Sequence, residues 1–189
     1  MYQALLADAR FHRMLRAIDD DLAAACRTVG CLLCGGRLHS ARYPRKPRGC
    51  PGFYDEHDRR NSFCCARDGC RKRMTPASVR FLGRKVYMAM VVTLVSAMQH
   101  AAKASRRQLA ESLGVDRRTV ARWRTWWLVT FVATPFWRAA AAAFVPPADP
   151  RCLPVSALDR FDGDPERRLI AFLRFLGPIT AGGAMRQAF

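Results

Sequence analysis

Acidic side chains are scarce in this sequence, and their scarcity is its strongest compositional signal. The 189 residues include 15 Asp and Glu against 32 Lys and Arg, which gives a formal net charge of +17. Solubility alone does not require so large an excess, whereas a positive field concentrates polyanions and speeds their encounter with a protein. The alternative, a solvated surface on a generally arginine-rich protein, does not explain why the positive stretches coincide with motifs.

Long hydrophobic runs and a secretory signal are also lacking. The longest uncharged apolar run, Val86–Met98, has 13 residues, and a bilayer needs about 20. Met1–Ala7 has no basic segment, and charges at Asp8, Arg10 and Arg13 interrupt any apolar run. We therefore expect a cytoplasmic protein with no membrane contact. Its eight cysteines are expected to stay reduced, which favours metal binding over disulfides.

The positive charge is concentrated in two stretches. Residues 37–85 hold 14 basic and 4 acidic side chains, a net +10, and residues 103–124 hold 7 and 2, a net +5. Residues 1–36 carry no net charge, and residues 125–189 carry a net charge of only +2. Any polyanion should therefore contact these two stretches.

Residues 2–26 are predicted to form one amphipathic helix. Its apolar face is either core or a dimer contact, and three adjacent carboxylates, Asp19–Asp21, lie beside it. We interpret these carboxylates as a solvated helix surface rather than a metal site. The apolar side chains recur at intervals of four, three and four residues; they are Phe11, Leu15, Ile18 and Leu22.

Residues 31–80 lack helical periodicity and are rich in Gly, Pro, Arg and Cys. Gly36–Tyr43 and Ser62–Ala66 are predicted short strands, joined by a loop that contains several prolines and glycines. Such a segment buries little apolar surface. A bound metal is therefore expected to hold it together.

The remainder of the chain is predicted to be helical. Residues 81–100 fit a buried helix, and residues 105–132 contain two more. Thr134-Pro135 begins a helix that runs to about 144. Asp164-Pro165 begins a final helix, which Gly177-Pro178 ends.

These elements predict a mostly α fold with a zinc-ribbon β insertion, followed by a trihelical helix-turn-helix domain and C-terminal helices. The expected divisions are an N-terminal helix, a zinc ribbon, the helix-turn-helix domain, C-terminal helices and a loose tail. They span residues 1–28, 29–80, 81–132, 133–180 and 181–189.

Two pairs of cysteines have the spacing of metal ligands. Cys31-Leu-Leu-Cys34-Gly-Gly is typical of a zinc knuckle, in which backbone amides of a tight turn donate to the two sulfurs. Tetrahedral zinc needs two more ligands. Cys70 follows the turn signal Asp68-Gly69, and its partner is Cys65 or the adjacent Cys64.

Only one of the two adjacent cysteines can face the metal, because neighbouring strand residues point to opposite sides. Cys65 is favoured, since Phe63 would then share its face, and Cys64 is the alternative. Weaker candidates are Cys50, His39 and His57. Four thiolates would close the coordination shell, so the predicted Zn²⁺ is structural and not catalytic.

Residues 106–125, RRQLAESLGVDRRTVARWRT, meet the local demands of a helix-turn-helix. Ala110 is small where the second helix crosses the first, Gly114 tolerates a positive φ in the turn, and Asp116 can cap the second helix. The inward positions are apolar; they are Leu109, Leu113, Val115, Val120 and Trp123.

The outward positions of this motif are basic, which predicts a double-stranded DNA partner. Arg117, Arg118 and Arg122 lie where a second helix usually enters the major groove, and arginine there can bind guanine through two hydrogen bonds. A helical hairpin that only packs against a protein is the alternative. Four further basic residues are expected to contact phosphates; they are Lys103, Arg106, Arg107 and Arg124.

The order of these parts resembles the N-terminal DNA-binding region of bacterial insertion-sequence transposases and their small companion proteins. The four cysteines match the ribbon, residues 71–78 (RKRMTPAS) resemble the strand that leaves it, and Phe81–Gln99 and Arg106–Thr125 match the apolar helix and the helix-turn-helix. The resemblance covers about residues 31–130. It implies DNA binding and a transposase or recombinase partner, while the apolar face of residues 2–26 leaves a homodimer open.

The sequence departs from that family in two ways. Four residues rather than two separate Cys65 from Cys70. Such transposases also carry three well-separated carboxylates, whereas the acidic residues after position 130 cluster in 149–166 and fit caps and loops. We therefore expect a non-enzymatic accessory or regulatory protein of a mobile element. The alternatives are an ordinary transcriptional regulator, a split or truncated nuclease, and a zinc ribbon that docks on protein or RNA.

Overall fold

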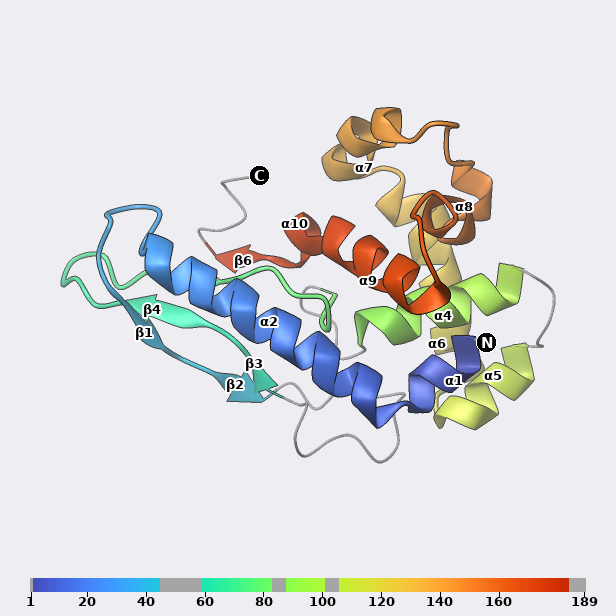
Figure 1. Cartoon of the computed structure of the whole chain (residues 1–189), viewed down its shortest axis with the longest axis horizontal. Coiled ribbons are helices and arrows are strands. Elements are labelled where there is room, and N and C mark those ends of the chain that lie inside the picture. Colours follow the sequence, from blue (N-terminus) through green and yellow to red (C-terminus); the bar gives the residue numbers. More distant parts are fainter. Residues whose placement is uncertain (1, 45–58, 83–87, 101–105, 184–189) are drawn as a thin grey trace.

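The computed structural model describes residues 2–44, 59–82, 88–100 and 106–183, and it is mostly helical with small sheets (Figure 1). No helix in these ranges is long and apolar enough to cross a membrane. The helices are α1 (Tyr2–Ala7), α2 (Ala9–Val29), α4 (Ala89–His100), α5 (Arg106–Leu113), α6 (Arg117–Thr125), α7 (Pro135–Ala140), α8 (Val155–Leu158), α9 (Pro165–Phe175) and α10 (Gly177–Thr180). The strands are β1 (Leu38–Ser40), β2 (Tyr43–Pro44), β3 (Arg59–Arg60), β4 (Phe63–Cys65), β5 (Arg73–Thr75) and β6 (Gly182–Gly183).

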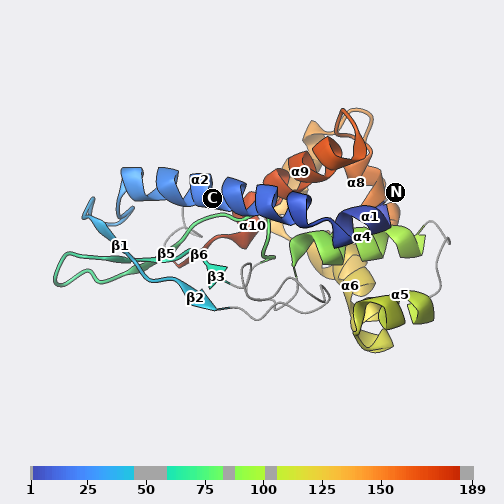
Figure 2. The ribbon, with the colours of Figure 1, turned by 60° about the horizontal axis from the view of Figure 1, so that its bottom comes forward.

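The N-terminal segment forms two helices and not the single predicted one. Asp8 separates them, because its carboxylate accepts from the Arg10 and Phe11 amides and caps α2. The apolar stripe of α2 is core: Phe11 and Leu15 are fully buried. The last turns of α2 lie along the sheet (Figures 1 and 2), where Ala23 contributes to a small cluster of buried residues.

The four-stranded antiparallel sheet has the order β1-β4-β5-β6. Leu38 in β1 faces Cys65 in β4, and Phe63 in β4 faces Met74 in β5. The predicted loose tail is wrong at its start, since Gly182 and Gly183 pair with β5 and complete the sheet. A second pair, β2 with β3, extends from it.

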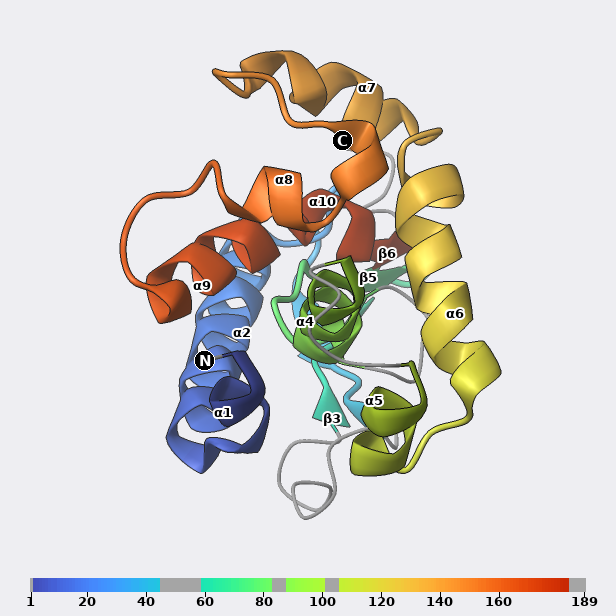
Figure 3. The same ribbon diagram turned by 90° about the vertical axis from the view of Figure 1, so that its right-hand side faces the viewer.

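α4 is the central helix of the molecule, and Figure 3 shows it end-on among α2, α5, α6 and α9. Residues 88–97 are all buried, as a helix with no polar face requires. The predicted start at residue 81 is wrong: Phe81 forms a β-bridge with Met88, and α4 begins at Ala89. Residues 83–87 lie outside the described part.

The C-terminal helices cover α6 and its continuation, the π-helical turn Trp126–Phe131. The predicted starts are confirmed: Thr134 and Asp164 cap α7 and α9 through their side-chain oxygens. α7 ends at Ala140 and a short 3-10 turn, Ala141–Ala143, continues the chain. The predicted end is also confirmed, since α9 stops at Phe175, just before Gly177-Pro178, and these two residues begin the separate short helix α10.

Aromatic side chains fill the space between these helices. Trp127 and Phe131 are fully buried. Their cover includes α9 as well as α4, since the Trp127 and Phe172 ring centroids are 5.7 Å apart. Aromatic pairs at such distances add about 0.5–1.5 kcal/mol beyond their buried area.

The predicted solvated surface at Asp19–Asp21 is wrong for Asp19, whose side chain is 4% exposed. Its carboxylate accepts from the Ser78 hydroxyl (2.6 Å), the Val79 amide (2.8 Å) and Arg80 Nε (2.9 Å). This buried ion pair is fully hydrogen-bonded, which such pairs require. It fixes α2 to the segment that leads from the sheet into α4.

Candidate metal centre and nucleic-acid interface

Four thiols meet at the end of the sheet: all Sγ atoms of Cys31, Cys34, Cys65 and Cys70 lie within 4.8 Å of one another. Cys31 and Cys70 Sγ are 3.7 Å apart, and Cys34 and Cys65 Sγ are 3.5 Å apart. Two turns supply them, one between α2 and β1 and one between β4 and β5. These four cysteines can hold a metal ion.

Backbone hydrogen bonds shape the first turn. The Gly35 amide donates to the Cys31 carbonyl (2.7 Å), and the Cys31 amide donates to the Gly36 carbonyl (2.9 Å). A Cβ at Gly36 would lie 3.0 Å from Cys65 Sγ and 3.3 Å from Cys34 Sγ. Glycine is needed there because any side chain would occupy the space that the sulfurs use.

The second turn is built in the same manner. The Cys70 amide donates to the Arg67 carbonyl (3.1 Å), and the Cys65 amide donates to the Lys72 carbonyl (3.0 Å), which closes the turn. The Arg67 amide donates to Cys65 Sγ (3.4 Å). Amides aimed at sulfur stabilise thiolates and are typical of the outer shell of metal-binding cysteines.

The sheet register decides between the two adjacent cysteines. Cys65 is fully buried and faces its three partners. Cys64 points to the other side of the sheet, next to His39 in β1 and Arg73 in β5, and its thiol donates to the Arg71 carbonyl at 3.4 Å. Neither Cys64 nor His39 belongs to the group of four.

Cys50 and His57, the weaker candidates, lie outside the described residues.

Electrostatics within the cluster favour a bound cation. The Leu33 amide is the main cause that lowers the pKa of the Cys31 thiol to about 7. The Arg67 amide acts in the same direction on Cys65, but burial and the neighbouring sulfurs raise the pKa of Cys65 to about 12. Four thiolates therefore cannot coexist here without a positive ion between them.

The sulfur positions fit zinc. A Zn–S bond of about 2.3 Å in tetrahedral geometry implies sulfur–sulfur separations of about 3.8 Å. The Cys34–Cys65 and Cys31–Cys70 separations, 3.5 and 3.7 Å, are near that value. Four sulfur ligands would leave no coordination position for water or substrate.

Helices α5 and α6 are joined by a tight turn, Gly114–Asp116. Gly114 adopts φ +60° in the turn, and the Val115 amide donates to the Ala110 carbonyl (3.0 Å). Asp116 caps α6 by accepting from the Arg118 amide (2.6 Å). The predicted inward residues lie in the large core or against it; they are Leu109, Ala110, Leu113, Val115, Val120 and Trp123.

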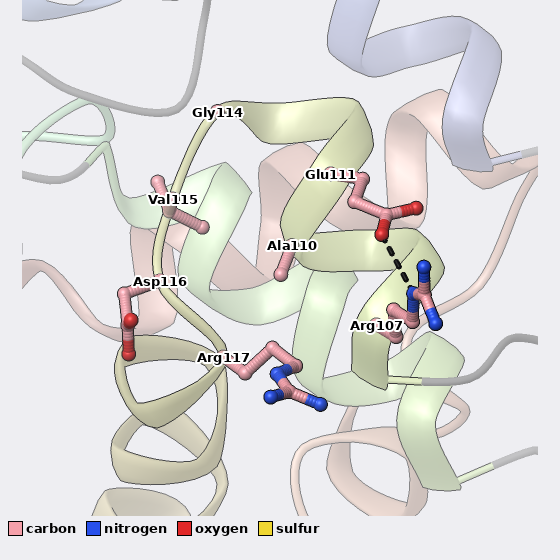
Figure 4. Close-up of a pocket in the computed structure, with 7 residues that line it drawn as sticks. All are labelled: Arg107, Ala110, Glu111, Gly114, Val115, Asp116 and Arg117. Carbon is pink, nitrogen blue, oxygen red and sulfur yellow. Dashed lines mark hydrogen bonds and ion pairs between the residues drawn. The ribbon is translucent and has the colours of Figure 1, made fainter.

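The arginines on the outer face are exposed. Figure 4 shows Arg117 at the start of α6 extending toward Arg107 on α5, whose Nε donates to Glu111 (2.8 Å). Arg118 and Arg122 continue the same surface along α6, and Arg122 Nη2 donates to the Thr119 hydroxyl (2.9 Å). These side chains form one positive surface, which we call the arginine face.

Two adjoining hollows mark the arginine face. One of about 580 Å³ lies between α5 and the start of α6. Another, of about 420 Å³, is lined by Arg107, Arg117, Arg118 and Ala121. Both are surface depressions with arginine walls, so they suit an anionic partner better than an apolar ligand.

The other predicted phosphate contacts differ in their placement. Arg124 is half-buried and near enough to Cys152 to act on the pKa of that thiol, so it faces the C-terminal segment and not the arginine face. Arg106 is the first residue of α5, and Lys103 lies outside the described residues.

Asp19 is the residue that sequence reasoning missed. Its position in the sequence indicates burial, since Asp19 follows Leu15 by four residues and so shares the buried face of α2. Its partners at 78–80 are some sixty residues away. No periodicity could identify them.

Comparisons of the chain with known protein families, with curated proteins and with solved structures find no match.

Proposed function

We propose that this protein binds double-stranded DNA at specific sequences through the arginine face of α5 and α6. One observation carries the proposal: the inner side of the motif is apolar and buried, while Arg107, Arg117, Arg118 and Arg122 all lie exposed on its outer side. A helix that presents arginines at its first turns suits the major groove, where guanine offers two acceptors to one guanidinium.

The four-cysteine cluster is proposed to bind a structural Zn²⁺. It would hold the ribbon end of the molecule in shape and supply no chemistry, because its four sulfurs complete the shell. Exposed arginines on the strands, Arg59 and Arg73, can add sequence-independent contacts to phosphates.

The biological role we propose is that of an accessory or regulatory protein of a mobile element, with a transposase or recombinase as its partner and no catalytic domain of its own. The order of ribbon, apolar helix and helix-turn-helix supports this role. The carboxylates after residue 130 support the non-catalytic assignment, since Asp149 and Asp164 accept backbone amides as caps. An ordinary transcriptional regulator would use the same DNA chemistry.

Selection of bound sequences from a random DNA pool tests the proposal. We expect one enriched sequence whose binding weakens with salt. Arg118→Ala should reduce discrimination between that sequence and a scrambled one by about 1–3 kcal/mol. Arg174→Ala, an exposed arginine on α9, is the matched control and should leave discrimination unchanged.

Two outcomes would count against base recognition by α6. An equal loss on both DNA sequences would restrict Arg118 to a phosphate contact. A pool with no enriched sequence would remove sequence specificity altogether. The nuclease alternative would instead be established if the protein cleaved labelled DNA in the presence of Mg²⁺ and a single Asp→Asn substitution abolished that cleavage.

A further inference from the structure

Apolar side chains are exposed at the turn that carries the first two cysteines. Val29, Leu32 and Leu33 are 67%, 42% and 52% exposed, and they are three of the five large exposed hydrophobic residues in the described part of the chain. All three lie within five consecutive residues. We call Leu32, Leu33 and Val29 the apolar tip.

None of these three side chains belongs to either hydrophobic cluster of the described residues. Leu32 and Leu33 lie between two cysteines of the cluster, where the turn requires only backbone amides, such as that of Leu33 acting on Cys31. Polar residues would serve the turn equally well and would be better solvated. Neighbouring leucines that face water without a packing role are typical of a contact site for another molecule.

Basic residues lie in the two cysteine turns, near the apolar tip. Arg37 follows the first turn, and its carbonyl accepts from the Ala66 amide (2.8 Å), which brings the second turn beside it. The Cβ atom of Arg67 lies 3.3 Å from the Cβ position at Gly36. Four exposed cations, Arg37, Arg67, Arg71 and Lys72, face one local acid, Asp68, which pairs with Arg71 at 3.6 Å.

The apolar tip and the arginine face lie at opposite ends of the molecule. In Figures 1 and 2 the turns that follow α2 and β4 form the left-hand end, and α5 lies at the right. A DNA duplex docked on α6 would leave the tip free. Both surfaces can therefore be occupied at once.

We infer that the apolar tip, with its basic rim, docks an acidic amphipathic segment of a partner protein. Such a segment would cover Leu32 and Leu33 with its own apolar side chains and place carboxylates against Arg37 and Arg67. A phosphate backbone would satisfy the arginines but leave the leucines in water. A second copy of this chain would oppose like charges across the contact, which is unfavourable.

The test uses the full-length, zinc-loaded protein and a displayed library of short random peptides. We expect enriched peptides that combine Asp or Glu with Leu, Ile or Phe. Binding of a selected peptide, followed by fluorescence anisotropy, should weaken about tenfold or more for the double variant Leu32→Ser/Leu33→Ser. Arg67→Glu should weaken it as well.

Val129→Ser is the matched control, because Val129 is equally exposed (61%) but lies on the π-helical turn after α6. It should leave peptide binding unchanged. Retention of one zinc per chain and of the wild-type far-UV circular dichroism in the double variant shows that the fold is intact, so the outcome is independent of whether α6 recognises DNA.

Three results would overturn the inference. One is the absence of enriched peptides, or enrichment of peptides without acidic residues. Another is loss of DNA affinity in the intact double variant, which would assign the tip to nucleic acid. The third is a wild-type dimer in sedimentation that the double variant converts to monomer, which would make the tip a contact between copies.

Discussion

The two faces of strand β4 give adjacent residues different roles. Cys64 and Cys65 are adjacent in β4, yet only Cys65 lies with the other three thiols. The alternation of strand side chains was predictable from sequence. The sequence did not fully determine which of the two cysteines faces the metal site, because that depends on which side of the sheet α2 covers.

This pair gives a direct test of the metal centre. Cys65→Ser should lose its zinc on purification, because oxygen is a poor substitute for a buried thiolate ligand. Cys64→Ser should retain one zinc per chain, since a serine hydroxyl can also donate to the Arg71 carbonyl. Metal content by elemental mass spectrometry checks both, and equal contents in the two variants would contradict the assignment.

Asp19 is the residue on which stability should depend most sharply. Asp19→Asn leaves Arg80 buried without its counter-charge, because the Arg80 side chain is 3% exposed. The cost should be about 3–5 kcal/mol of unfolding free energy, measured in urea. Asp21→Asn, on the exposed side of the same helix, should stay within about 0.5 kcal/mol, and a similar loss in both variants would argue against the buried network.

Individual elements show which local signals can be trusted. Side-chain caps at Thr134 and Asp164 marked the starts of α7 and α9 correctly, because capping involves neighbours in sequence. The break at Asp8 and the start of α4 were missed. The first is a cap inside an apparently continuous periodic pattern, and the second depends on a bridge between Phe81 and Met88.

At the turn between α5 and α6, the cost of a left-handed backbone conformation can be measured without steric effects. A Cβ at Gly114 would meet no atom within 4 Å, so a substitution there is strained only by its φ of +60°. Gly114→Val should cost about 1–2 kcal/mol of unfolding free energy, and Gly114→Asn should cost less because Asn tolerates this conformation. Equal costs for the two variants in urea unfolding would show that the turn relaxes.

The whole molecule has two unequal cores. Among the described residues, the larger cluster contains 29 buried residues around α4, whereas the smaller one, beside the four-stranded sheet, contains seven, two of them candidate metal ligands. The sequence predicted this contrast in outline, because residues 31–80 are poor in apolar periodicity. It could not predict that β6 closes the ribbon sheet, since two glycines carry no side-chain pattern.

Chelation of the metal should therefore unfold one end of the molecule and spare the other. Hydrogen exchange measured by mass spectrometry should rise in residues 31–44 and 59–75 after zinc removal. Protection in α4 and α9 should persist, because their buried surface does not depend on the cysteines. Loss of protection in α4 to the same extent would mean that the two cores unfold as one unit.

Because β6 lies far along the chain from the other strands, the four-stranded sheet can be completed only late in synthesis. Arg60 donates to the carbonyl of Thr180, 120 residues later, and the Ser78 amide donates to its hydroxyl, 102 residues later. Beyond them, β6 supplies the last strand of the sheet. On the ribosome the cysteine turns emerge early. The edge of β5 stays unpaired until residues 182–183 leave the exit tunnel. An unpaired edge is a template for mispairing with other chains, so β5 is open to aggregation until β6 pairs with it.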